Sequence, residues 1–98
     1  MILILSTFSN KEEAHKIGKE LLKEKLIACY NLTPVESSYL WKGKIEETNE
    51  VLMIIKTSKS FKEVEEFITE HHTYETPEII EIETKNVNEK YLKWIKNL

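Results

Sequence analysis

The chain has 98 residues, the length of one domain; 41% of them are hydrophobic and 32% are charged. All 14 basic residues are lysines and all 17 acidic residues are glutamates, so the net charge is −3. This charge excludes a general electrostatic affinity for nucleic acid. The lack of arginine removes the side chain that grips phosphates bidentately. Abundant Lys and Glu are typical of thermostable proteins, although AT-rich coding bias gives a similar composition.

The cellular compartment follows from the cysteine count and the N-terminus. One cysteine, Cys29, cannot form an internal disulfide, so folding does not depend on an oxidising compartment. The N-terminus leads directly into an apolar run, without a charged leader, a cleavage site or a long apolar span. We therefore expect a single cytoplasmic domain over residues 1–98, with neither membrane nor nucleic acid as a partner.

A strand and a helix are predicted first. Residues 1–5 (MILIL) form an unbroken apolar run, which favours a strand covered on both faces. Asn10 with Glu13 predicts a helix N-terminus, and the helix should end near Lys25. Its apolar stripe has helical spacing and consists of Ala14, Ile17, Leu21 and Leu22.

Residues 26–57 predict a long β-hairpin that turns at Lys42-Gly43-Lys44. The first arm, residues 26–41, is far longer than a typical strand of about five or six residues, so part of it should project and contact another chain. Pro34 has no backbone N–H to donate to a neighbouring strand, so it should lie at a bulge or on an unpaired edge of the sheet. Gly43 favours the tight turn, with a turn at residues 46–49 as the alternative. The run at residues 51–55 (VLMII) predicts a second strand buried on both faces.

The last third predicts a helix, a strand and a final helix. Ser60 and Glu63 form a capping box, and the helix that follows should end near His71-His72, with an apolar face of Phe61, Val64, Phe67 and Ile68. A loop at residues 73–77 and a strand at residues 78–83 come next. Asn86 and Glu89 predict the start of the final helix, whose stripe is Val87, Tyr91, Trp94, Ile95 and Leu98.

The element order β-α-β-β-α-β plus a C-terminal helix predicts an α+β, ferredoxin-like fold with a projecting hairpin. In that fold the first and third strands lie at the sheet's centre and both helices cover one face. Both central strands are apolar on both sides, and each Ile or Leu left in water forgoes about 1.5–3 kcal/mol. We therefore expect copies of the chain to cover the open face for one another.

Five stretches in order along the chain carry a family resemblance: residues 28–31 (ACYN), 38–45 (SYLWKGKI), 50–57 (ending in IKT), 71–79 (HHTYETPEI) and 91–95 (YLKWI). Together they resemble the CutA family, the divalent-cation tolerance proteins. The resemblance implies a homotrimer whose sheets face one another and whose hairpins reach onto neighbouring subunits. It also implies a link to tolerance of copper and other divalent metals, and a shape similar to the trimeric nitrogen-regulatory signal proteins.

Two positions depart from the family pattern. Family members that resemble copper binders pair two histidines with a Cys at the end of the first strand, where this chain has Ser6. A hydroxyl binds soft copper much less well than a thiolate does. Thr73 stands where the family has a proline after the second histidine, which loosens that loop.

His71 and His72 are the best metal candidates, because imidazole binds Cu²⁺, Ni²⁺ and Zn²⁺. Adjacent helical side chains point about 100° apart, so Glu75 or a neighbouring subunit would have to complete the site. The alternative role for the two histidines is to complement the dipole at a helix C-terminus.

The resemblance also implies an inter-subunit cleft containing Cys29, Lys56, Thr57 and Tyr74. Lys56, Thr57, His72, Tyr74 and Glu75 should then form a polar cluster. The competing interpretations are that Cys29 is a small buried hydrophobe and that Lys56 merely pairs with Glu75 or Glu78.

Five other side chains are assigned from their surroundings. Tyr39 and Trp41 are predicted anchors of the trimer interface. Tyr91 and Trp94 are predicted core residues, and His15 a solvated residue.

No nucleophile–base pair and no phosphate-binding glycine loop can be identified, so a non-enzymatic protein is expected. The leading hypothesis is a homotrimeric copper-tolerance protein that binds a divalent metal weakly between subunits and has no other cofactor. The alternatives are a trimeric small-ligand sensor that signals to a partner protein, and a structural scaffold.

Overall fold

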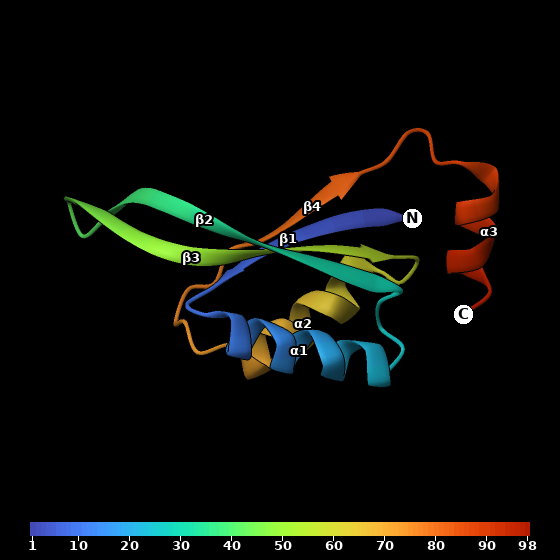
Figure 1. Cartoon of the computed structure of the whole chain (residues 1–98), viewed down its shortest axis with the longest axis horizontal. Coiled ribbons are helices and arrows are strands. Elements are labelled where there is room, and N and C mark those ends of the chain that lie inside the picture. The colour runs from blue at the N-terminus through green and yellow to red at the C-terminus, as the bar shows by residue number, and fades with distance from the viewer.

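The computed structural model describes residues 1–98 and contains four strands and three helices. In chain order these are β1 (Ile2–Phe8), α1 (Lys11–Lys23), β2 (Cys29–Trp41), β3 (Lys44–Thr57), α2 (Phe61–His71), β4 (Ile79–Glu83) and α3 (Glu89–Lys96). The strands form one antiparallel sheet in the order β2-β3-β1-β4, and α1 and α2 lie together on one side of it (Figure 1). The predicted element order and the central position of the first and third strands are confirmed.

The core fills the space between the sheet and the two helices. Ile4 of β1 lies opposite Ile55 of β3, and both are fully buried. The rest of this cluster comes from the ends of β1, from β3 and from the inner faces of the helices: Phe8, Ala14, Ile17, Leu21, Ile27, Met53, Val64 and Ile68. One face of the sheet is thus fully covered within the chain.

The other face of the sheet is apolar and largely open. Side chains alternate along a strand, so the neighbours of Ile4 and Ile55 point away from the helices. These outward side chains are Leu3, Leu5, Leu52, Ile54, Ile80 and Ile82. Ile80 and Ile82 of β4 are 48% and 41% exposed. The prediction that residues 1–5 and 51–55 are covered on both faces therefore does not hold within one chain.

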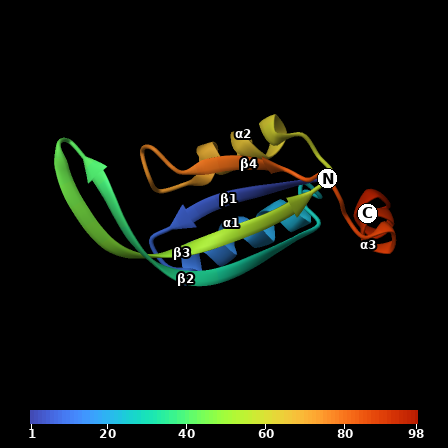
Figure 2. The ribbon, with the colours of Figure 1, turned by 90° about the horizontal axis from the view of Figure 1, so that it is seen from above.

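The β2–β3 hairpin extends well beyond the rest of the sheet, as predicted. β1 pairs with β3 only as far as Val51, so residues 44–50 of β3 pair with β2 alone. Figure 2 shows this two-stranded arm curving away past the end of β1. Lys42 and Gly43 have positive φ angles of 50° and 79°, which confirms the predicted turn and excludes the alternative at residues 46–49.

Pro34 lies on the edge strand β2, opposite Val51 in an uninterrupted register, so the edge position is confirmed and no bulge forms. The strand itself begins at Cys29 rather than at residue 26. The preceding Lys25 has a φ of 57°, because the chain reverses direction after α1.

Local capping signals locate the first two helices well. The Asn10 side chain accepts a hydrogen bond from the Glu13 N–H at 2.9 Å. Ser60 and Glu63 form the complete reciprocal capping box, and α2 ends at His71 as predicted. The predicted stripe of α1 is wrong at Leu22, which is exposed.

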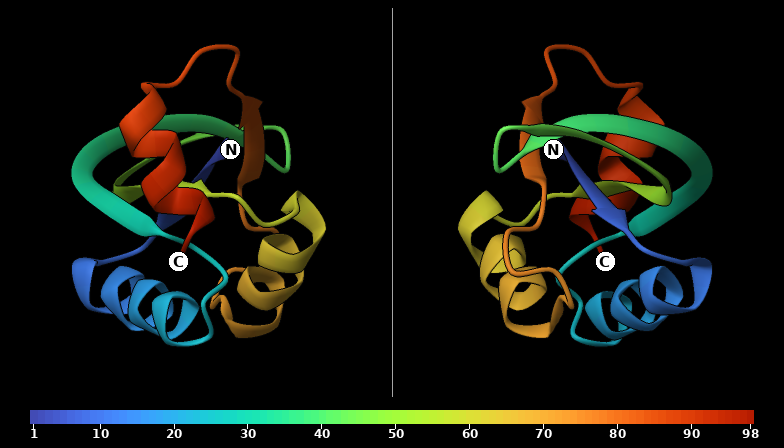
Figure 3. Two further views of the ribbon diagram at one scale, coloured as in Figure 1. Left: turned by 90° about the vertical axis from the view of Figure 1, so that its right-hand side faces the viewer. Right: turned by 90° about the vertical axis from the view of Figure 1, so that its left-hand side faces the viewer.

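The last helix differs most from its prediction. α3 is capped by Asn88, which accepts from the Tyr91 N–H, and not by Asn86. Only Ile95 of α3 is buried, so the prediction that Tyr91 and Trp94 are core residues is wrong. The physical reason is position: α3 lies at the end of the sheet near the N-terminus, away from α1 and α2 (Figures 1 and 3).

Candidate functional site

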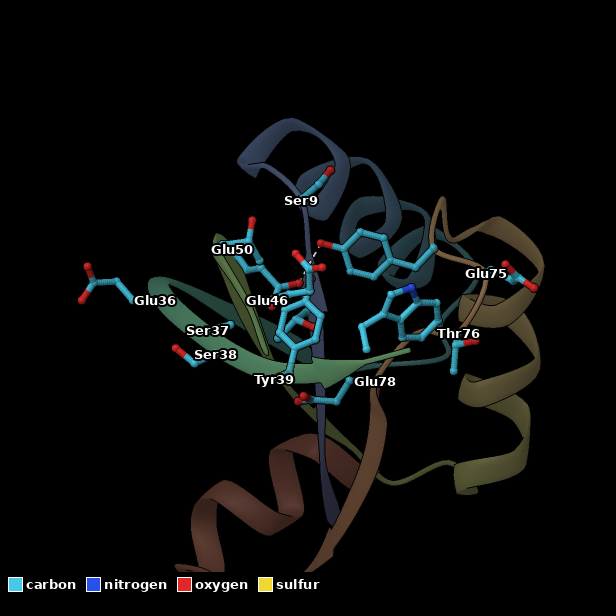
Figure 4. Close-up of a pocket in the computed structure, with 14 residues that line it drawn as sticks. Ser9, Glu36, Ser37, Ser38, Tyr39, Glu46, Glu50, Glu75, Thr76 and Glu78 are labelled. Atoms are coloured by element: carbon cyan, nitrogen blue, oxygen red, sulfur yellow. Dashed lines mark hydrogen bonds between the residues drawn. The ribbon is translucent and has the colours of Figure 1, made fainter. Parts of the chain in front are cut away.

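A cleft of about 880 Å³ lies where the hairpin arm, the end of β1 and the loop between α2 and β4 meet (Figure 4). β1 stops at Phe8 while the arm continues and curves, which leaves this space open. The lining side chains are Thr7, Ser9, Glu36, Ser37, Ser38, Tyr39, Trp41, Glu46, Thr48, Glu50, Tyr74, Glu75, Thr76 and Glu78.

The cleft is acidic. Five of its residues are glutamates, and it contains neither lysine nor histidine. The two ion pairs of the chain, Lys23–Glu20 and Lys62–Glu66, lie on the exposed surfaces of α1 and α2 and involve no cleft residue. The cleft carboxylates therefore have no cationic partner within the chain.

One hydrogen bond ties the α2–β4 loop to the base of the arm. The Tyr74 hydroxyl donates to Glu50 Oε2 at 2.7 Å, a contact that Figure 4 marks with a dashed line. Burial raises the pKa of Tyr74 well above its ordinary value, and the hydrogen bond to the Glu50 carboxylate raises it further. The phenol therefore stays protonated and keeps donating throughout the physiological range.

His72 is a structural anchor with no free nitrogen. Its Nε2 donates to the Thr7 carbonyl at 2.8 Å, and its Nδ1 accepts from the Tyr74 N–H at 3.0 Å. The ring also stacks on Phe8, with centroids 4.5 Å apart. Because both nitrogens are engaged, His72 in this geometry cannot also bind a metal.

His71 keeps one nitrogen available. Its Nδ1 donates to the Phe67 carbonyl at 2.8 Å and its ring stacks on Phe67, which leaves Nε2 without a partner on an exposed side chain. Glu75 lines the cleft, whereas neither histidine does. Within one chain no three His, Cys or Glu side chains are arranged to hold a metal ion. A site containing His71, His72 and Glu75 is therefore not formed by a single subunit.

The remaining predicted cleft residues lie at the other end of the sheet. Cys29 pairs with Lys56 in the register, and its sulfur lies 3.6 Å from the Tyr91 hydroxyl. Lys56 hydrogen-bonds to Asn31 rather than to Glu75 or Glu78. Thr57 is buried and donates to the Leu26 carbonyl. Tyr74 lies beside Glu50, in the middle of β3 and six residues before Lys56, so the predicted polar cluster does not form within one chain.

Two further side chains differ from expectation. Ser6 is fully buried in the middle of β1, where its hydroxyl donates to the Glu78 carbonyl at 2.7 Å. His15 is not merely solvated, because its Nδ1 lies 2.8 Å from the Tyr30 hydroxyl. The Tyr30 ring occupies the space that a side chain at Gly18 would need.

Sequence reasoning did not identify the acidic cleft. Tyr39 and Trp41 were singled out only as interface residues, and Glu46 and Glu50 not at all. The available signal was the stretch from residue 45 to residue 50 (IEETNE), which contains three glutamates and no lysine.

None of the three helices combines the length and the apolar character needed to cross a membrane.

The sequence matches the family described as CutA1 divalent ion tolerance protein over residues 2–98. The divalent-cation tolerance protein CutA of Pyrococcus horikoshii is 49% identical over 96 residues, covering 97% of this chain and 94% of that protein. The corresponding protein of Thermotoga maritima is 42% identical over 97 residues, covering 98% of this chain and 96% of that protein. An Arabidopsis relative, 39% identical over 98 residues, covers 98% of this chain but only 54% of its own length, and is chloroplastic.

Solved structures agree over nearly the whole chain. The crystal structure of CutA1 from Pyrococcus horikoshii has a TM-score of 0.95 at 47% identity, covering 99% of this chain and 96% of that one. The periplasmic divalent cation tolerance protein CutA from Archaeoglobus fulgidus has a TM-score of 0.95 at 40% identity, covering 99% and 97%. This chain therefore belongs to the CutA1 divalent ion tolerance family.

Proposed function

We propose that this protein acts in divalent-cation tolerance as a cytoplasmic homotrimer of ferredoxin-like subunits, binding metal weakly where subunits meet. The proposal assigns it a binding role rather than an enzymatic one. The observation that carries it is the open apolar face of the sheet, formed by β1, β3 and β4. Membership of the family supports the cation-tolerance part of the proposal.

The energetics of this face favour self-association. Completing the burial of a half-exposed Ile such as Ile80 or Ile82 contributes on the order of 1 kcal/mol. Four partly buried Leu and Ile side chains continue the same surface on β1 and β3. A second copy of the face is the simplest cover of matching size and chemistry.

The hairpin arm supports the same conclusion. A two-stranded hairpin is at best marginally stable in water by itself. Leu40 and Ile45 near its tip are 76% and 73% exposed, and Tyr39 and Trp41 are nearly half exposed. Aromatic residues of this kind commonly anchor protein interfaces, so the arm would be stabilised by lying on a neighbour.

The proposed metal ligands are the Nε2 of His71 and the Glu75 carboxylate, completed by groups from a second subunit. His72 serves this site indirectly, by fixing the loop that carries Glu75. The buried Ser6 hydroxyl is already engaged, and no thiolate replaces it, so the donors are nitrogen and oxygen. Such donors suit Cu²⁺, Ni²⁺ or Zn²⁺ better than Cu⁺, which prefers sulfur.

Calorimetric titration with Cu²⁺ tests the metal proposal. The His71→Ala and Glu75→Gln variants should each weaken binding on the order of tenfold or more, while His15→Ala should bind like the wild type. Sedimentation of the same samples checks that every variant keeps its assembly state. Identical heats for the wild type and the His71→Ala variant would refute the assignment.

The small-ligand sensor is retained as a second candidate because of the cleft. Its volume of about 880 Å³ lies within the usual range for ligand sites, and its aromatic and carboxylate lining suits an organic cation. A neighbour could also bring Cys29, Lys56 and Thr57 of one subunit towards Tyr74 of another. Micromolar binding of an organic cation that is lost in Glu46→Gln and unaffected by metal would favour this role.

A further inference from the structure

The α2–β4 loop, residues 73–78, has no helix or strand of its own, yet both of its ends are fixed to β1. At its start the His72 ring donates to the main chain of β1 at 2.8 Å. At its end the Ser6 hydroxyl of β1 donates to the Glu78 carbonyl at 2.7 Å. Between these two anchors the loop carries Glu75, the carboxylate of the metal site proposed above. The position of Glu75 therefore depends on what holds the middle of the loop.

A carboxylate of α1 reaches this loop from the side. Glu13 Oε2 accepts from the Thr73 hydroxyl at 3.1 Å, a contact between residues 60 positions apart in the chain. The same oxygen accepts from the Ser9 hydroxyl at 2.6 Å, and the Glu13 N–H donates to Asn10 at 2.9 Å. Main chain and side chain of Glu13 are thus both held at the start of α1. The carboxylate is preorganised as an acceptor, so binding Thr73 costs little further ordering.

The main chain at Thr73 would also accept a restraint of a different kind. His72 has φ −72° and ψ 145°, the extended conformation that a residue before a proline adopts. The Thr73 N–H has no main-chain acceptor, so its loss would break no main-chain hydrogen bond. A proline at position 73 would fix φ there and stiffen the loop without using the hydroxyl. The contribution of the hydroxyl can therefore be removed and then replaced.

We propose that Glu13 is a positioning residue: its carboxylate holds the α2–β4 loop through Thr73 and thereby keeps Glu75 in place. The inference rests on the metal role proposed above and adds a residue that does not itself touch the metal. The competing interpretation is that Glu13 serves only its own helix, as an acidic residue of the first turn. Glu12 lies in the same turn and shares that effect, so it separates the two interpretations.

Amide hydrogen exchange in the metal-free protein tests the inference. The Tyr74 N–H donates to His72 Nδ1, so its protection factor reports opening of the loop. Glu13→Ala should lower this factor on the order of threefold to fivefold, while the amides of β1 and β3 stay protected as in the wild type. Glu12→Ala is the matched control and should leave the factor of Tyr74 unchanged. Wild-type protection of Tyr74 in Glu13→Ala would overturn the inference.

A double-mutant cycle assigns the effect to the contact itself. Thr73→Val should lower the protection of Tyr74 as Glu13→Ala does, and the two changes together should cost no more than either alone. Additive losses would refute the contact and leave the metal role intact.

The same variants connect the loop to metal binding. Glu13→Ala should weaken Cu²⁺ binding on the order of threefold, less than Glu75→Gln does, because it displaces the ligand without removing it. Adding Thr73→Pro to Glu13→Ala should restore both the protection of Tyr74 and most of the Cu²⁺ affinity. Restored protection without restored affinity would refute the link to Glu75. Lower protection in Glu13→Ala, with no Cu²⁺ binding by the wild type, would support the restraint of the loop and refute the metal role.

Discussion

The adjacent histidines His71 and His72 should respond in opposite ways to the same substitution. His72→Ala removes two hydrogen bonds to the main chain, worth about 0.5–1.5 kcal/mol each. It also removes the stack on Phe8, worth about 0.5–1.5 kcal/mol. The expected loss is about 2–4 kcal/mol in the free energy of unfolding. His71 is exposed and makes one hydrogen bond within its own helix, so His71→Ala should cost about 0.5 kcal/mol or less.

Metal binding should show the reverse order. His71 offers a free Nε2, so its removal should abolish most of the Cu²⁺ heat, whereas His72→Ala, which only loosens the loop that carries Glu75, should lose less of it under conditions where that variant remains folded. Urea denaturation and calorimetry at one subunit concentration measure both effects. Equal losses of stability in the two variants would refute the anchoring role of His72. A loss of metal binding in His72→Ala alone would refute its exclusion as a ligand.

Three further predictions concern packing, capping and ionisation. Gly18→Ala should destabilise the protein by about 1–2 kcal/mol despite the higher helix propensity of alanine, because the new Cβ would lie 2.5 Å from the Tyr30 ring. Urea denaturation should show that adding Tyr30→Leu to this variant relieves part of the loss. A Gly18→Ala variant more stable than the wild type would contradict the reasoning. Ser60→Ala should cost about 1 kcal/mol at neutral pH. Hydrogen bonds from Ser60 lower the pKa of Glu63, so the part of the cost that comes from the Ser60 hydroxyl donating to the carboxylate should disappear as pH falls through that lowered pKa, while the part from the Glu63 N–H donating to Ser60 should remain; a cost of Ser60→Ala that does not shrink in acid would contradict this assignment. Tyr74 should titrate above the ordinary tyrosine range, and its raised pKa should make the protein less stable as pH rises through the ionisation of tyrosine. An ultraviolet titration in which Tyr74→Phe removes a tyrosine ionisation at the ordinary pKa would contradict this prediction.

What the sequence could predict is mainly local. The caps at Asn10 and Ser60 and the turn at Lys42-Gly43 depend on residues three or four apart, so the pattern alone identifies them. The strand order also follows from the order of elements, because few topologies accommodate it. The start of α3 was missed because Asn86 and Asn88 are both good caps, and the three-residue spacing to Glu89 favoured the wrong one.

What the sequence could not predict depends on contacts between distant segments. The cleft exists because the arm curves towards the loop at residues 73–78. The contact that joins them is between Tyr74 and Glu50, which are 24 positions apart in the chain. The role of His72 is set by the Thr7 carbonyl, 65 residues away. The exposure of Tyr91 and Trp94 reflects the position of α3 outside the core, which an amphipathic pattern alone does not reveal.

Shielding of the open sheet face by copies of the same chain is the central claim, and sedimentation equilibrium at micromolar concentration tests it most directly. We predict a species of three times the 11.6 kDa subunit mass that persists on dilution, and partial dissociation when Ile80→Glu and Ile82→Glu place carboxylates on that face. A well-folded wild-type monomer would contradict the account.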